Sequence, residues 1–229
     1  MVLRGSRRGI AIRRPRRAAL RSAGPVALCA VLLAGCAAAL PALPGGRTTP
    51  LARTDLALGG AARIPLGNRD ALGSLGGGLA PLVAARHGLL LHTDLGLMVV
   101  GTLARVELRQ EAVLSDDTIR TRLSVAAAPF GGVDTDGAAT IGAELPLLLG
   151  IDGSSVIELW VGCRPAVLRA PYGDGASATV WRLGAVVGLA VGFRRVHALV
   201  ELTADYEHRV GPLPDGVVLT PGFALRLRL

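Results

Sequence analysis

The sequence predicts an all-β protein, an antiparallel up-and-down transmembrane β-barrel of about ten strands (roughly 8–12) with its apolar face outward. Beyond residue 52, apolar and polar residues alternate with a period of two in segment after segment, many segments are long, and glycine is abundant throughout. A period of two separates side chains onto two faces only in an extended chain, and scattered glycine disfavours long helices. Residues 195–210 show the pattern most clearly: every second residue from Val196 to Tyr206 is apolar, and charged residues such as Glu201 and Asp205 lie between them.

The first 35 residues are predicted to be a signal peptide. They contain eight arginines and no acidic residue, and an apolar segment from Ala23 to Gly35 follows the basic part. A basic region followed by a short apolar region is typical of secretory signal peptides. Residues 33–36, Leu-Ala-Gly-Cys, resemble the bacterial lipobox, which implies that Cys36 is lipidated and becomes the mature amino terminus. By the same resemblance, Ala37 in place of an aspartate favours the outer membrane; the alternative is ordinary cleavage in the alanine-rich run after Cys36.

The formal net charge of +8 belongs to this leader. Beyond residue 35 the chain holds 17 arginines, 17 acidic residues and no lysine, so the exported part is formally neutral. A neutral chain gives no support to nucleic-acid binding. Residues 36–52 are rich in alanine, proline and glycine and are predicted to be a flexible tether, and residues 53–229 are predicted to form a single barrel domain.

Ten strand-like segments follow the tether, separated by turn signals such as Asp152-Gly153. In most of them, apolar residues occupy one face and polar residues, glycine or alanine the other, and the alternation is weaker in residues 79–86. We expect strands at residues 53–66, 79–86, 90–100, 103–114, 119–128, 138–150, 156–169, 178–193, 195–210 and 217–229.

The connections between these segments differ in length at the two ends of the expected barrel. Long loops at residues 67–76, 131–137, 170–177 and 210–216 share one rim, and tight turns after residues 86, 150 and 193 share the other. Transmembrane barrels have this asymmetry, with longer extracellular loops and shorter periplasmic turns.

Alternation occurs in any half-buried sheet, so it does not by itself decide whether the apolar face meets lipid or a protein core. Three features favour charges inside and aliphatic residues outside: the length of the strands, the glycine and alanine on their polar faces, and the alternating sign of charges along residues 103–114. Such charges can pair within a closed interior. We expect the interior to be lined by Arg63, Arg105, Glu107, Arg109, Glu111, Arg120, Arg122, Glu144, Arg182, Glu201 and Asp205.

Four aromatic residues are expected to face lipid: Trp181, Phe193, Tyr206 and Phe223. With this architecture, residues 53–229 resemble the small outer-membrane β-barrel proteins of Gram-negative bacteria. Two features depart from that resemblance, because the chain ends at Leu229 instead of an aromatic residue and a lipobox is unusual in such barrels. The alternative fold is a soluble, lipid-anchored β-barrel or sandwich that faces the periplasm and binds a small apolar ligand.

No residue pattern points to catalysis, a metal or a cofactor. The four histidines lack the spacing of metal ligands. Asp134 and Asp136 lie in a predicted loop but lack the rest of a calcium-binding motif. Cys163 is the one cysteine after Cys36 and has no partner for an internal disulfide in a lipidated chain.

Taken together, these features predict a non-enzymatic outer-membrane β-barrel, anchored through Cys36, with a structural or surface-interaction role and a narrow, charge-lined interior. Its expected partner is outer-membrane lipid, and no cofactor, metal or nucleic acid is expected. A barrel of this size has a narrow lumen that paired side chains can close, so a wide pore is not expected.

Overall fold

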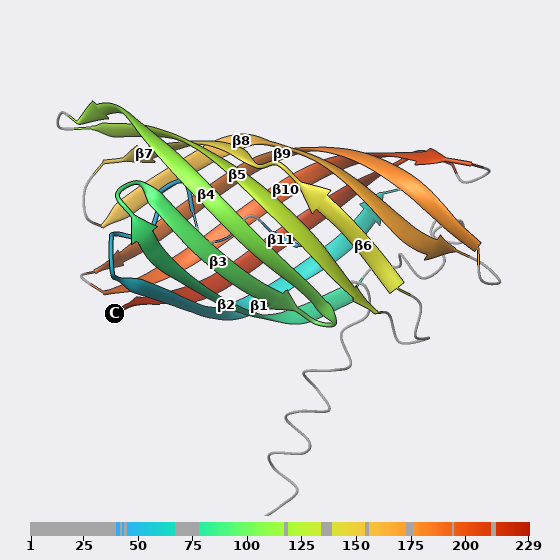
Figure 1. Cartoon of the computed structure of the whole chain (residues 1–229), viewed down its shortest axis with the longest axis horizontal. Helices are drawn as coiled ribbons and strands as arrows, with labels where there is room; N and C mark the ends of the chain where they lie inside the picture. Colours follow the sequence, from blue (N-terminus) through green and yellow to red (C-terminus); the bar gives the residue numbers. More distant parts are fainter. Residues whose placement is uncertain are drawn as a thin grey trace, which may run out of the picture.

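The computed structural model describes residues 40, 41, 43, 45–66, 78–116, 119–133, 139–153, 156–172, 176–193, 195–211 and 214–229. The predicted signal peptide, Cys36 and the loop residues Asp134 and Asp136 lie outside the described residues. Figure 1 shows the strands wound into one barrel. They are β1 (Thr54–Leu66), β2 (Gly78–Leu90), β3 (Thr93–Val100), β4 (Leu103–Asp116), β5 (Arg120–Val133), β6 (Ala139–Glu144), β7 (Leu147–Asp152), β8 (Ile157–Tyr172), β9 (Ala176–Phe193), β10 (Val196–Val210) and β11 (Gly216–Arg228).

The strands form one antiparallel sheet that closes on itself. Strands adjacent in the chain pair with each other, except β6 with β7, and β1 pairs with β11 to join the two ends. β6 and β7 share one position, because both lie between β5 and β8. The interruption falls at Leu145-Pro146, where the proline has no N–H to donate to a ladder. The barrel therefore has ten strand positions, and the predicted fold class is confirmed.

The two ends of the barrel carry different connections. The start of β1 and the end of β11 lie at one end, together with the connections β2–β3, β4–β5, β7–β8 and β9–β10; we call this end the terminal rim. The connections β1–β2, β3–β4, β5–β6, β8–β9 and β10–β11 lie at the opposite end, which we call the loop rim, and the β6–β7 interruption lies within the wall. All four loops that the sequence predicts to be long connect strands at the loop rim.

One turn predicted from the sequence is wrong. The sequence suggests that His87-Gly88 ends the second strand, whereas β2 continues to Leu90 and the chain reverses at Leu91-His92. Gly88 serves a close contact instead of a turn, because a Cβ at this position would overlap the carbonyl group of Pro50.

Most aliphatic side chains of the strands face outward and most charged side chains face inward, while a smaller apolar cluster that includes Leu82, Leu148 and Leu199 is buried inside the barrel. In β10 exposed and buried residues alternate along the whole strand. Val200 and Leu202 are 53% and 44% exposed, whereas Glu201 is 4% exposed. A soluble barrel shows the opposite arrangement, so the predicted outward apolar face is present. Among the described residues, no helix is long and apolar enough to cross a bilayer.

The first described residues lie inside the barrel. We call residues 40, 41, 43 and 45–50 the lumen segment; up to Thr49 they are buried, except for the half-buried Arg47. At the terminal rim Leu51 forms a parallel bridge with Gly88, and the chain turns at Ala52 into β1. The sequence predicts a flexible tether over residues 36–52. The described residues of that range up to Thr49 are instead packed in the lumen, where backbone groups of the segment find charged partners.

Candidate functional site: the lumen

The lumen holds most of the charged side chains that the sequence places inside the barrel. Eight of them are at most 4% exposed: Arg63, Arg105, Glu107, Arg109, Glu111, Glu144, Glu201 and Asp205. Arg122 and Arg182 are half-buried. Arg120 does not lie in the interior: its side chain is 54% exposed and pairs with Asp116 at 2.8 Å. The reason is its position as the first residue of β5, where the wall ends at the terminal rim.

Several charged residues are buried in the structure but are not among the interior residues predicted from the sequence. They are Asp55, Arg86, Asp94, Asp152, Glu158, Arg164, Glu207, Arg209 and Arg226. Strand parity carries a signal for most of them, since Glu207 and Arg209 simply continue the face of Glu201. The signal for Arg86 was obscured by weak alternation in β2 and by the wrong turn at His87-Gly88.

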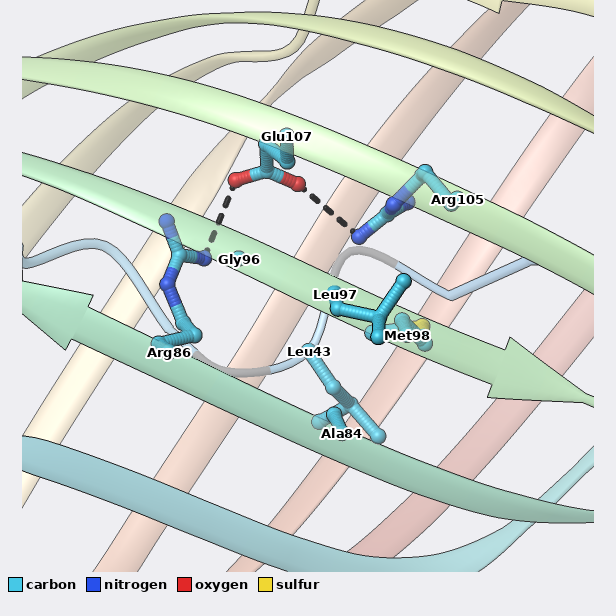
Figure 2. A pocket seen from close by; sticks show the side chains of 8 residues that line it. All are labelled: Leu43, Ala84, Arg86, Gly96, Leu97, Met98, Arg105 and Glu107. Atoms are coloured by element: carbon cyan, nitrogen blue, oxygen red, sulfur yellow. Dashed lines mark hydrogen bonds and ion pairs between the residues drawn. The ribbon is translucent and has the colours of Figure 1, made fainter.

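Glu107 of β4 lies at the centre of a cluster of arginines. Its carboxylate accepts hydrogen bonds from Arg86 Nη1 at 3.0 Å and from Arg109 Nε at 2.9 Å. Arg105 Nη2 lies 3.0 Å from its second oxygen. Figure 2 shows the carboxylate between the guanidinium groups of Arg86 and Arg105. One buried acid therefore contacts three buried arginines.

The network continues around the wall from this cluster. Arg86 pairs with Asp94 of β3, and Arg105 pairs with Glu144 of β6. Glu144 in turn lies 3.8 Å from Arg164 of β8. Because each buried charge in this network lies close to an opposite charge, the interior avoids the large cost of an isolated buried charge.

Gly188 of β9 provides space for a contact between β8 and β10. In the strand register it lies between Trp160 and Glu201. The indole Nε1 of the fully buried Trp160 donates to Glu201 Oε2 at 3.1 Å, passing over the glycine. A Cβ at position 188 would overlap the indole ring. The glycines that the sequence places on the polar face of β9 therefore make room for neighbouring long side chains.

Further ion pairs link strands that are not adjacent. Arg164 of β8 lies 3.5 Å from Asp205 of β10 and passes over Gly184. Arg226 of β11 pairs with Glu158 of β8 at 3.1 Å. Such pairs span more than one strand spacing of about 4.8 Å, so they fill the interior instead of lying along its wall.

Lumen side chains bind the lumen segment through its backbone. Arg164 donates to the Leu40 carbonyl oxygen, and Arg109 donates to the Gly45 carbonyl oxygen. Three carboxylates accept backbone N–H groups of the segment: Glu158 from Gly46 at 3.0 Å, Glu111 from Thr48 at 2.6 Å, and Asp94 from Thr49 at 2.7 Å. The partners belong to β3, β4 and β8, so the segment is held from different sides of the barrel.

Leu43 anchors the segment at an apolar spot in the lumen. It is fully buried, and Figure 2 shows it pointing toward Ala84, with Met98 nearby. A small cavity adjoins this spot and is also lined by Arg86 and Glu107. Leu43 thus lies in the lumen where apolar residues of β2 and β3 meet the arginine cluster.

A polar cluster lies on the exterior near the loop rim. Asp215, in the β10–β11 connection, accepts hydrogen bonds from Tyr206 Oη at 2.6 Å, from His208 Nδ1 at 3.0 Å and from the backbone N–H of Arg209 at 3.1 Å. These bonds, the one from Tyr206 first, lower the pKa of the Asp215 carboxyl to about 2. The ionised carboxylate ties the connection to the end of β10.

The four aromatic residues predicted to face lipid lie on the outer surface. Trp181, Phe193, Tyr206 and Phe223 are all at least half exposed. Phe223 lies beside Gly60 of the neighbouring strand, which leaves space for its ring. Contact of these rings with lipid stays a prediction.

Depth-dependent substitutions test whether the outer surface meets lipid. We expect Leu202→Arg, near the middle of β10, to destabilise the barrel in phospholipid vesicles by about 2–4 kcal/mol, because arginine is costly at the bilayer midplane. Val196→Arg, at the terminal-rim end of the same strand, is the matched control with an expected cost of about 0–1 kcal/mol. The measurement is urea-induced unfolding from vesicles. Equal, small costs at both sites would show that Leu202 faces water.

Paired charges inside and aliphatic side chains outside are the arrangement of transmembrane β-barrels, and the fold and the lumen together define that class. No family model matches the chain. No curated protein matches it. Among solved structures, Neisserial surface protein A is similar with 12% sequence identity and a TM-score of 0.36, over 77% of this chain and 96% of that one. Ail, the attachment invasion locus protein of Yersinia pestis, is similar with 10% identity and a TM-score of 0.27, over 78% and 99%.

Proposed function

We propose that this chain is a non-enzymatic β-barrel of the outer membrane of a Gram-negative bacterium, with a structural or surface-interaction role and a lumen closed to solutes. The observation that supports it best is the inverted barrel, with an aliphatic exterior and an interior filled by ion pairs, a cluster of apolar side chains and the lumen segment. A lumen filled in this way has little room for a solute.

The dimensions of the strands support a position in the membrane. β8, β9 and β10 contain 16, 18 and 15 residues, more than the roughly 9–11 residues that a tilted strand needs to cross a bilayer. The alternative from the sequence, a soluble barrel that binds an apolar ligand, requires aliphatic side chains around a cavity. In the described strands, Val200, Leu202 and their equivalents lie outside, so this alternative loses its binding surface.

The chemistry of the lumen supports a non-enzymatic role. The lumen carboxylates described above contact arginines, backbone N–H groups or, for Glu201, the Trp160 indole N–H, and they hold the interior together. In the described part of the chain, no group of three or more His, Cys, Asp and Glu side chains is placed to hold a metal ion.

Planar-bilayer recording tests the closed lumen. The purified mature chain, reconstituted into a lipid bilayer, is expected to give no steady ion conductance, because paired side chains and the lumen segment fill the interior. Heat-modifiable migration in gels provides the control that the barrel is folded. A steady conductance from the folded protein would contradict the proposal.

Lipid anchoring through Cys36 is a separate part of the proposal, supported by the lipobox resemblance alone. Mass spectrometry of the mature chain tests it directly. The variant Cys36→Ala separates the anchor from the barrel: we expect the variant to stay in the membrane fraction during carbonate extraction. Release of the variant would show that the barrel itself is not embedded.

A further inference from the structure

The lumen segment is bound as a ligand would be, through groups that every polypeptide carries. Arg164 and Arg109 donate to its carbonyl groups, and carboxylates on β3, β4 and β8 accept its N–H groups. Hydrogen bonds in which one partner is ionised are about twice as strong as those between neutral groups. The lumen therefore presents donors and acceptors to the backbone of a polypeptide.

The small residues of the segment allow this close approach. Gly45 has φ of 101°, which favours glycine. An ideal Cβ on Gly46 would lie 2.7 Å from the Cα of Gly150 in β7, so a larger residue cannot occupy this position. The charged side chain of Arg47 is half-buried, and its Nε lies 4.0 Å from Glu158. Recognition thus depends mainly on the backbone and on two glycines, with two side chains adding to it: buried Leu43, and Thr48, whose hydroxyl donates to Glu111 at 3.1 Å.

The wall does not depend on the segment for its own ion pairs. Each side chain that binds the segment also pairs with an oppositely charged residue of the wall. The pairs, with the residue that binds the segment first, are Asp94 with Arg86, Arg109 with Glu107, Glu111 with Arg122, Arg164 with Asp205, and Glu158 with Arg226. The strand pairings close the barrel without the segment as well. Its withdrawal therefore leaves a wall whose charges are still compensated.

In the described chain, the lumen segment is covalently connected to the wall at the terminal rim, where it leads into β1. There the Ala52 N–H donates to the Gly88 carbonyl at 3.0 Å, and the Arg53 N–H donates to the Pro50 carbonyl at 3.0 Å. Ala52 has φ of 58°. This tight turn reverses the chain, so the chain before it runs parallel to β2 at Leu51 and antiparallel to β1, and the described residues up to Thr49 are in the lumen.

We propose that the lumen is a binding site for a polypeptide segment, that the chain's own lumen segment occupies it as a removable plug, and that the barrel conducts ions when the segment leaves. This inference rests on the proposed membrane barrel with a closed lumen. It adds that the closure depends on the segment, in addition to the ion pairs of the wall.

The experiment compares conductance in planar bilayers for four forms of the mature chain. They are the wild type, Gly46→Val, a deletion of residues 40–49, and the matched control Gly153→Val, at a glycine whose added Cβ meets no atom within 4 Å. We expect steady conductance from Gly46→Val and from the deletion, and none from the wild type or Gly153→Val. A synthetic peptide with the sequence of residues 40–51 is then expected to block the deletion variant.

Each outcome decides a different statement. Folded but non-conducting Gly46→Val and deletion variants would overturn the plug and leave the closed barrel standing. A conducting wild type would overturn the proposed closed lumen itself. Failure of both variants to fold would show that the wall requires the segment, which contradicts its being removable. Conductance that the peptide does not block would contradict the binding site.

Discussion

Replacing Glu107 by glutamine is expected to destabilise the barrel by about 3–5 kcal/mol, the cost typical of removing one partner of a buried ion pair. Glutamine has nearly the same shape but no charge. Arg86 and Arg105 retain acidic partners elsewhere, whereas Arg109 keeps the Gly45 carbonyl and loses the carboxylate that it contacts most closely. The measurement is urea-induced unfolding in phospholipid vesicles.

Two variants show whether this cost comes from buried charge. Asp116→Asn removes the acid of an exposed pair with Arg120 and is expected to cost about 0–1 kcal/mol. The double variant Glu107→Gln, Arg109→Gln restores the balance of charge and is expected to recover part of the lost stability. A Glu107→Gln cost as small as that of Asp116→Asn would mean that water solvates the cluster.

The sequence predicts the wall of the barrel well, because a period of two records directly which side chains share a face. Arg105, Glu107, Arg109 and Glu111 are an example: their alternation is strict, and all four are buried. Arg86 is a residue that this periodicity does not place. Its strand alternates weakly, and the glycine that suggests a turn beside it serves a contact with another part of the chain.

The contents of the lumen were not predictable in the same way. Residues 40–50 have the composition of a linker, and apart from the Thr48 hydroxyl their hydrogen bonds to Glu158, Glu111 and Asp94 use backbone groups, which leave no side-chain pattern. Contacts between a linker and residues more than 40 positions away depend on barrel closure. The sequence shows that residues 36–52 lack a strand pattern, but not that the lumen supplies partners for them.

The contact of Trp160 with Gly188 is predictable from the sequence only in part. Parity places the tryptophan on the inner face of β8 and the glycine on the inner face of β9, but their opposition depends on the register of the two strands. Given the register, the pair is complementary: the largest side chain in the lumen lies over a residue without one. Interior volume in a narrow barrel is set by such pairs.

Trp160→Ala is expected to destabilise the barrel by about 3–5 kcal/mol, because it leaves a cavity and removes the hydrogen bond to Glu201. Gly188→Ala is expected to cost about 1–3 kcal/mol for the opposite reason, since its methyl group meets the indole ring. Gly131→Ala is the control, because a Cβ there lies at ordinary contact distances of 3.4 Å or more.

The double variant Trp160→Ala, Gly188→Ala separates this explanation from a general sensitivity of β9 to substitution. Removal of the indole vacates the space that the new methyl group needs, so the double variant is expected to be no less stable than Trp160→Ala alone. Urea-induced unfolding in vesicles measures all four free energies. If the costs of Trp160→Ala and Gly188→Ala simply add, Gly188 is required for the strand backbone and not for the tryptophan. Coupling between them would show that a glycine on one strand fixes where a large side chain of the next strand can lie.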